Sequence, residues 1–210
     1  MLEFIGATKE DLLLYPDSDG KPIAESTLQY EWITKIKSNL DVLFAKRKDV
    51  FVAADLFWYA VEGKPRVRLA PDVLVAFGRP KGHRYSYMQW KEEGIPPHIV
   101  IEVHGPGSRF EEMRKKFRFF DRHGVEEYYL YDPETFELNG WRREAGALVV
   151  IPTMAGWKSK RLGVRFDVSS GKLVLRHPNG ERFLSMLERH MLHKEAQELA
   201  TSATGVALPD

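Results

Sequence analysis

Two acidic residues stand where an apolar strand rarely carries a charge. Glu102 follows the apolar run 99–101, and Asp72 follows Pro71 at the head of the apolar run 73–77. A carboxylate on a buried strand is costly unless it is paired or binds a metal. If the two runs are neighbouring strands, both carboxylates reach one end of the sheet, where their repulsion favours a bound cation. Oxygen ligands favour Mg²⁺ or Mn²⁺. The alternative for Asp72 is a turn cap, and for Glu102 a pair with a lysine.

A lysine on the segment after Glu102 is suited to act beside such a metal. Residues 109–122 predict a helix whose apolar face centres on Met113, and at 100° per residue Lys116 lies at the border of that face. A cation there could position water or offset charge in a transition state. The alternative is a border lysine that pairs with Glu112 one turn earlier.

The elements that must position these residues alternate between helix and strand. Ser26 and Gln29 have capping-box spacing at the start of the first helix, and Gly124 suits the end of the second. The order predicts an α/β domain, that is a mixed β-sheet flanked by helices with an extra β-hairpin region and a C-terminal helix. We expect a helix over 26–48, two or three strands over 49–78, a long loop over 78–98, a strand over 99–103, a helix over 109–122, a strand over 125–132, a hairpin over 136–153, two short strands over 160–180 and an amphipathic helix over 181–200.

Length and composition bound the class of protein. The 210 residues suit one domain over 25–180, with an N-terminal arm over 1–24 and a C-terminal helix and tail over 181–210. The chain has 31 basic and 30 acidic residues, so any nucleic-acid contact must come from local clustering of charge. No cysteine occurs, which excludes disulfides, cysteine-ligated zinc and a thiol nucleophile. The start has no signal-peptide pattern and no apolar run is long enough to span a membrane, so we expect a cytoplasmic protein.

Five motifs in order resemble one known family. They are A-P-D-V-L-V-A-F at 70–77, P-P-H-I-V-I-E-V at 96–103, G-P-G-S-R at 105–109, K-x-x-x-F at 116–120 and G-V-E-E-Y-Y-L-Y-D-P at 124–133. Together they resemble the Uma-two (DUF820-like) family of restriction endonucleases in the PD-(D/E)XK nuclease superfamily. The resemblance covers roughly residues 20–145 and implies a restriction-endonuclease-like core with one or two divalent metals at the strand ends.

The resemblance also implies a role for each site residue. Asp72 and Glu102 would be the acidic metal ligands, and the backbone carbonyl of Val103 a further ligand to Mg²⁺ or Mn²⁺. The usual lysine of the superfamily would lie two residues after Glu102, where this chain has His104. The chain resembles variants in which that lysine has moved to the following helix, which gives the role to Lys116.

The chain departs from the family after Glu102. Where the family commonly has a Leu-Ser-Pro-Ser-Thr-like run, residues 104–108 read His-Gly-Pro-Gly-Ser, so His104 is an extra titratable group of undetermined role. An acid often stands in the family where this chain has Glu112, and a polar residue often faces the site from the first helix. Gln29 and Glu25 are the candidates for that helper position.

The loop 78–98 mixes cations with aromatic rings, as a strand-gripping surface does. It could equally be a solvated loop that packs on a partner subunit. From this region and the second helix we expect nucleic-acid contacts by Arg79, Lys81, Arg84 and Arg109.

These observations favour a Mg²⁺-dependent endonuclease that hydrolyses DNA, with Asp72, Glu102 and Lys116 as catalytic residues. The main alternative is an inactive nuclease-fold module that binds nucleic acid or a protein partner. A glycosidase with Asp72 and Glu102 as its acid and base is weaker, because it gives Lys116 no role. The last helix and the hairpin around 136–143 are candidate surfaces for a homodimer.

Overall fold

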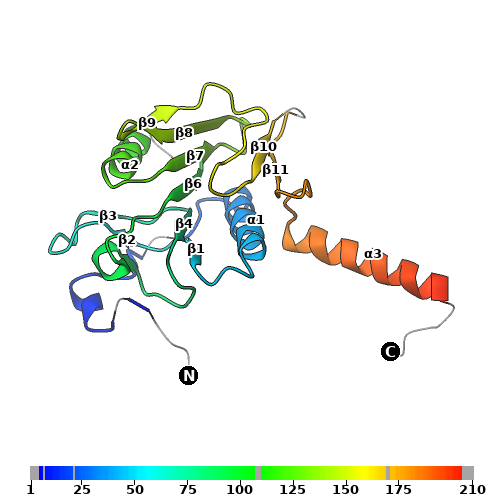
Figure 1. Cartoon of the computed structure of the whole chain (residues 1–210), viewed down its shortest axis with the longest axis horizontal. Coiled ribbons are helices and arrows are strands. Elements are labelled where there is room, and N and C mark those ends of the chain that lie inside the picture. Colours follow the sequence, from blue (N-terminus) through cyan, green and yellow to red (C-terminus); the bar gives the residue numbers. More distant parts are fainter. Residues whose placement is uncertain (1–4, 7, 21, 107–109, 169–170, 205–210) are drawn as a thin grey trace.

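A six-stranded mixed sheet forms the centre of the computed structural model, which describes residues 5–6, 8–20, 22–106, 110–168 and 171–204 (Figure 1). Its strand order is β1-β4-β6-β7-β8-β9, and only β6 and β7 run parallel to each other. The sheet confirms the expected mixed α/β class. The strands are β1 (Val50–Ala54), β4 (Val73–Phe77), β6 (Ile99–Val103), β7 (Glu127–Tyr131), β8 (Leu138–Glu144) and β9 (Ala147–Val150).

Helices α1 (Thr27–Leu43) and α2 (Phe110–Arg122) cover opposite faces of this sheet. Alternate residues of β6 separate the two cores, since Ile99 and Ile101 pack with α1 while Val100 packs with α2. The capping expected for α1 is present, because the Ser26 hydroxyl accepts the Gln29 backbone N–H at 3.1 Å. Both faces of β6 are therefore buried, which is the environment that makes Glu102 costly.

The segment 78–98, expected to be a long loop, contains β5 (Tyr87–Met88) and the 3-10 helix η2 (Gln89–Glu92). β5 joins β2 (Trp58–Tyr59) and β3 (Arg68–Leu69) in a small second sheet. A short 3-10 helix, η1 (Asp11–Leu13), precedes α1 in the N-terminal arm. The two or three strands expected over 49–78 are four, β1 to β4, and β5 was not expected. Two-residue strands such as β2, β3 and β5 have no readable alternation.

A buried ion cluster organises this segment and corrects one expectation. Glu92 is fully buried and accepts hydrogen bonds from Arg79 Nε at 3.0 Å and from Arg84 Nε at 2.6 Å. The Arg84 guanidinium also lies 3.8 Å from the ring centroid of Phe51. Neither guanidinium faces solvent, so the expectation that Arg79 and Arg84 contact nucleic acid is wrong. A buried carboxylate needs both partners, and that need accounts for the two arginines.

The C-terminal part packs on the α1 side of the sheet. Strands β10 (Arg165–Asp167) and β11 (Val174–Arg176) form a two-stranded sheet whose Phe166 and Leu175 join the core under α1. Helix α3 (Met186–Thr204) then projects away from the body (Figure 1). No helix among the described residues is long and apolar enough to cross a membrane.

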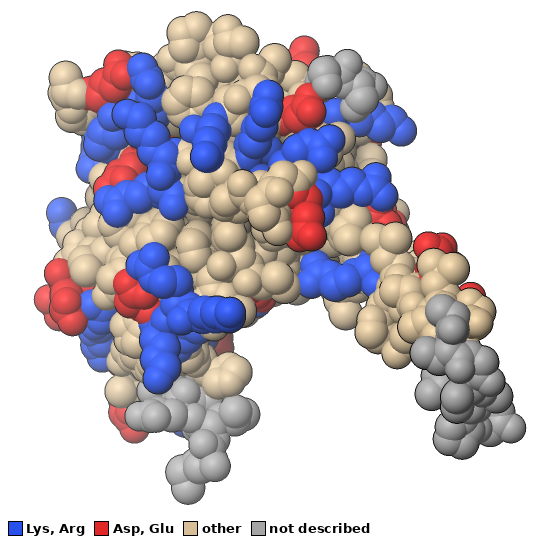
Figure 2. Space-filling view, turned by 45° about the vertical axis from the view of Figure 1, so that its right-hand side comes forward, with Lys and Arg blue, Asp and Glu red and all other residues tan. Residues whose placement is uncertain are grey.

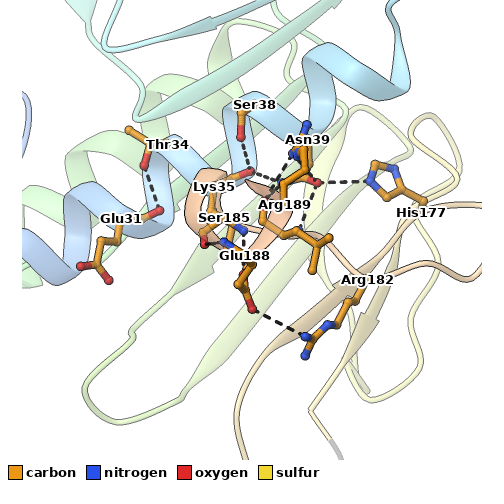
Figure 3. Close-up of polar contacts among 11 residues, drawn as sticks. Glu31, Thr34, Lys35, Ser38, Asn39, His177, Arg182, Ser185, Glu188 and Arg189 are labelled. Atoms are coloured by element: carbon orange, nitrogen blue, oxygen red, sulfur yellow. Dashed lines mark hydrogen bonds and ion pairs between the residues drawn. The ribbon is translucent and has the colours of Figure 1, made fainter. Parts of the chain in front are cut away.

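Asn39 of α1 anchors the start of α3 (Figure 3). Its amide nitrogen donates to the Leu184 carbonyl at 2.7 Å, and its amide oxygen accepts from the Leu184 N–H and from Arg189. Ser185 and Glu188 form a capping box at the first turn, with the Ser185 N–H donating to Glu188 Oε2 at 2.7 Å. The first turn of α3 is thus fixed to α1, whereas Leu187, Met191 and Leu199 remain exposed.

Candidate active site

Antiparallel pairing of β4 with β6 brings Asp72 and Glu102 to one end of the sheet. Val73 pairs with Ile101, so the start of β4 meets the end of β6. The Val103 backbone N–H donates to Asp72 Oδ2 at 2.7 Å. By the two-residue period, Glu102 shares the α2 face with Val100. The neighbourhood expected from the sequence is therefore present, and both carboxylates are buried.

Lys116 lies on α2, the helix that covers the face of the sheet to which Glu102 points, and it contacts Glu102. Its ammonium donates to Glu102 Oε2 at 2.6 Å, and the Lys116 side chain keeps 24% exposure against 4% for Glu102. Burial alone would lower the pKa of Lys116, but the charges of Glu102 and Asp72 outweigh it and raise that pKa. Lys116 is therefore held as an ammonium ion between the buried acids and solvent.

At the strand ends, the two buried carboxylates of Asp72 and Glu102 lie beside one ammonium group, that of Lys116. Burial, and after it the neighbouring charge of Glu102, raises the pKa of Asp72 well above its ordinary value, although Lys116 and the Val103 N–H oppose the rise. Glu102 Oε1 is buried and has no hydrogen-bond partner among the described residues. A buried carboxylate oxygen without a partner beside a second buried carboxylate is suited to bind a cation.

Gln29 ties the start of α1 to the same strand end. Its amide nitrogen donates to the Val103 carbonyl at 2.8 Å, while its amide oxygen accepts the Glu25 backbone N–H at 2.8 Å. A Cβ at Gly105 would lie 2.8 Å from Gln29 Oε1 and 2.8 Å from Glu25 Oε2. A side chain at position 105 would therefore displace the ends of the Gln29 and Glu25 side chains. Gln29 orients the carbonyl that was expected to bind the metal.

His104 is paired with a residue other than Glu102. Its Nδ1 lies 3.0 Å from Asp132 Oδ2 at the end of β7, and its Nε2 is buried without a partner among the described residues. The pKa of Asp132 is lowered: burial opposes the change, and hydrogen bonds from the Thr135 N–H, His104 and the Glu134 N–H outweigh it. Sequence reasoning missed Asp132, which stands just before the last residue of the Y-Y-L-Y-D-P motif. Parallel pairing of β6 with β7 brings it beside His104, and no local pattern gives that pairing.

A hollow of about 320 Å³ opens over these groups. Besides Asp72, Glu102, His104 and Lys116, the expected helpers Gln29, Glu25 and Glu112 line it. The N-terminal arm contributes Asp17 and Asp19, and the end of β1 contributes Asp55, whose pKa is raised by burial and then by Asp19. Sequence reasoning missed these three acids, because neither the arm nor the end of β1 carries a motif that singles them out. The wall of the hollow is strongly acidic, so an anionic substrate would need a cation there.

The donor atoms at the strand ends are suited to a hard divalent cation that keeps several of its waters. No group of three or more His, Asp or Glu side chains able to hold a metal occurs in the described ranges. Asp72 and Glu102 offer carboxylate oxygens, and the Val103 carbonyl has a second lone pair besides the one that Gln29 occupies. Mg²⁺ commonly binds through one or two carboxylates and keeps several waters, so this donor set fits Mg²⁺.

Basic side chains gather away from the buried arginine cluster. Residues 158–182 carry seven Lys or Arg against two Asp or Glu. Figure 2 shows Lys and Arg side chains spread over the upper part of one face. The Lys81 ammonium donates to the Phe44 carbonyl at 2.6 Å, and a contact of Lys81 with nucleic acid stays a prediction. Arg109, the other cation expected to contact nucleic acid, lies outside the described residues. We name the exposed cations of this segment the basic surface: Lys158, Lys160, Arg161, Arg165, Lys172 and Arg182.

Comparison with protein-family models identifies the family of this chain. The Uma2 model, described as "Putative restriction endonuclease", matches residues 11–171. No match is found among curated proteins. Among solved structures, the chain is similar to "a putative nuclease belonging to DUF820" from Anabaena variabilis, with 15% identity, coverage of 70% of this chain and 85% of that chain, and a TM-score of 0.49.

Proposed function

Because the chain belongs to the Uma2 family of restriction-endonuclease-like proteins, we propose that it is a Mg²⁺-dependent endonuclease that hydrolyses phosphodiester bonds of DNA. One observation carries this proposal. The buried Glu102 keeps one carboxylate oxygen bonded to Lys116 and the other without a partner in the described chain, beside the buried Asp72. A purely structural ion pair would satisfy both oxygens.

Asp72, Glu102 and the Val103 carbonyl would hold the metal at the strand ends. Bound there, Mg²⁺ would supply Lewis-acid polarisation of the phosphate and a lowered pKa of an attacking water. Asp72 and Glu102 are pre-oriented, since the Val103 N–H fixes Asp72 and the Lys116 ammonium fixes Glu102. Lys116 retains exposure toward the hollow, which supports a role in orienting the water and offsetting charge on the phosphate.

The decisive variant replaces Lys116 while leaving the carboxylates in place. We expect Lys116→Met to lower the Mg²⁺-dependent cleavage rate of plasmid DNA by about 100-fold or more, because a preorganised charge is lost. Lys115→Met is the matched control, since Lys115 lies on the same helix and is exposed. Equal rates for both variants would contradict the role of Lys116. Equal residual cleavage by Asp72→Ala and the wild type would identify a contaminating nuclease.

The basic surface supports DNA as the substrate through contacts with its phosphates. Replacing Lys158, Lys160 and Arg165 by Gln should weaken DNA binding and flatten its dependence on salt, while Mg²⁺ binding stays unchanged. An unaltered salt slope would place the DNA elsewhere.

A homodimer through α3 is the assembly that we propose. The exposed Leu187, Met191 and Leu199 lie on a helix that projects from the body, and such side chains are often covered by a partner. Light scattering should give a mass of two chains for the wild-type protein and a mass of one chain for Leu187→Glu. A wild-type monomer would contradict this assembly.

A further inference from the structure

An apolar groove lies beside the acidic hollow, on the same face of the sheet. Its volume is about 350 Å³, and it is bounded by α2 on one side and by β7 and β8 on the other. Phe110, Phe117 and Trp141 supply most of its aromatic surface. Phe110 is 68% exposed, so most of its ring is accessible at the edge of the groove.

The rotation of α2 places the groove and the proposed metal site on opposite flanks of one helix. Taking Met113 as the direction facing the sheet, Lys116 lies about 60° to one side at 100° per residue, while Phe117 and Phe110 lie about 40° and 60° to the other. Met113 and Tyr128 line both hollows. A chain that enters the acidic hollow and continues past Met113 therefore reaches the groove next.

The rim of the groove is basic although its floor is apolar. Arg114 and Arg118 line it and both are exposed, and the Arg114 guanidinium lies 5.8 Å from the ring centroid of Phe110. In the acidic hollow next to it, Asp and Glu outnumber Lys and Arg among the lining residues. A flat apolar group that belongs to an anionic chain matches this combination, because the ring packs on the floor while its phosphates meet the arginines.

We propose that the groove binds an unpaired nucleobase of the strand whose phosphate lies at Glu102 and Lys116. This inference rests on the proposed nuclease function and adds a substrate class to it. The base stacks on Phe110 and Trp141, and Arg114 and Arg118 contact the adjoining phosphates. Stacking on aromatic rings tolerates every base, so the groove selects single-stranded or locally unpaired DNA without selecting a sequence. A base inside a duplex would first have to leave its stack, at a cost of a few kcal/mol.

The test pairs the loss of an aromatic ring with the loss of a base. Binding is measured by fluorescence anisotropy of single-stranded oligonucleotides, with Lys116→Met in every protein so that no strand is cut. One oligonucleotide is intact, and others carry a single abasic site at successive positions. Phe110→Ala is the main variant because its exposed side chain is not needed for the core, Phe110→Tyr restores a stacking ring, and Tyr30→Ala is the control for an exposed aromatic residue outside the groove.

We expect Phe110→Ala to bind the intact strand about tenfold more weakly, and Phe110→Tyr and Tyr30→Ala to bind it normally. An abasic site at one position should cause a similar loss with Phe110 present and no further loss in Phe110→Ala, because the two changes remove the same contact. The proposal would be overturned if an abasic site at every position weakened binding equally in the protein with Phe110 and in Phe110→Ala.

Three other outcomes would also overturn it and are distinguishable. If the wild-type protein is dimeric and Phe110→Ala makes it monomeric, a second copy covers the groove in place of a base. If the wild-type protein neither binds nor cuts any oligonucleotide, the proposed nuclease function fails, and this inference fails with it. Normal Mg²⁺-dependent cleavage of single strands by Phe110→Ala, at wild-type KM, would refute the groove alone.

Discussion

Replacing Asp72 by Asn should stabilise the metal-free protein while removing its activity. Asp72 is buried beside the buried Glu102, and both burial and that neighbouring charge disfavour its ionised form. The amide oxygen of Asn can still accept the Val103 N–H, and Lys116 keeps its ion pair with Glu102. The substitution therefore removes a buried like charge without removing a hydrogen bond.

The size of the effect follows from these contacts. Replacing buried charges by neutral groups of similar shape commonly adds about 1–3 kcal/mol to the free energy of unfolding. For a chain of 210 residues this corresponds to a rise in Tm of about 2–12 °C. A metal held by Asp72 at 100 times its Kd would stabilise only the wild type, by about 2.7 kcal/mol. Saturating Mg²⁺ should thus remove or reverse the difference in Tm between Asp72→Asn and the wild type.

Thermal unfolding in EDTA and in a Mg²⁺ series measures both effects. Asp121→Asn is the matched control, because Asp121 also accepts a backbone N–H, from Leu148 at 2.7 Å, but stands outside the acidic hollow. We expect this control to respond to Mg²⁺ like the wild type. The reasoning is refuted if Asp72→Asn lowers Tm in EDTA, or if Asp72→Asn and the wild type gain equally from Mg²⁺.

Three further results should follow. Gly105→Ala should slow cleavage and lower the free energy of unfolding by about 1–3 kcal/mol, since its Cβ would lie 2.8 Å from Gln29 Oε1; kinetics and denaturant titration that match the wild type would disprove the close approach. Glu92→Gln should cost about 3–5 kcal/mol in denaturant titrations, because it removes the partner of two buried arginines; a smaller loss than 1 kcal/mol would contradict this. Burial lowers the pKa of His98 below 6.5, so the unfolded chain binds the proton first as pH falls. The free energy of unfolding should therefore decrease as pH falls through 6.5. The same dependence of this free energy on pH in His98→Gln would refute that role.

The sequence predicted the sheet and its acidic residues because those signals are local. Ser26 caps α1 and Gly124, with a φ of 94°, follows α2, as their types and positions indicated. The helical period of α2 singled out Lys116, and the structure brings it within 2.6 Å of Glu102. Strand alternation and helical period, together with the family motifs, were enough to predict that Asp72, Glu102 and Lys116 lie close together.

Contacts between distant segments escaped prediction for a physical reason. Glu92 reads as a surface charge in the run Lys91-Glu92-Glu93, yet it is fully buried because Arg79 and Arg84 fold over it. The pairing of His104 with Asp132 depends on the β6–β7 register, which no local pattern specifies. Mixed cations and aromatic rings can build either a surface or a core, and only tertiary packing decides between them.

The central claim is that Asp72 and Glu102 share one divalent cation. Crystals soaked in Mn²⁺ and measured at the manganese absorption edge test it most directly. We expect one anomalous peak within about 2.0–2.4 Å of a carboxylate oxygen of each residue, on the side of Glu102 Oε1. A peak elsewhere with none between Asp72 and Glu102, at millimolar Mn²⁺ and with the fold intact, would contradict the claim.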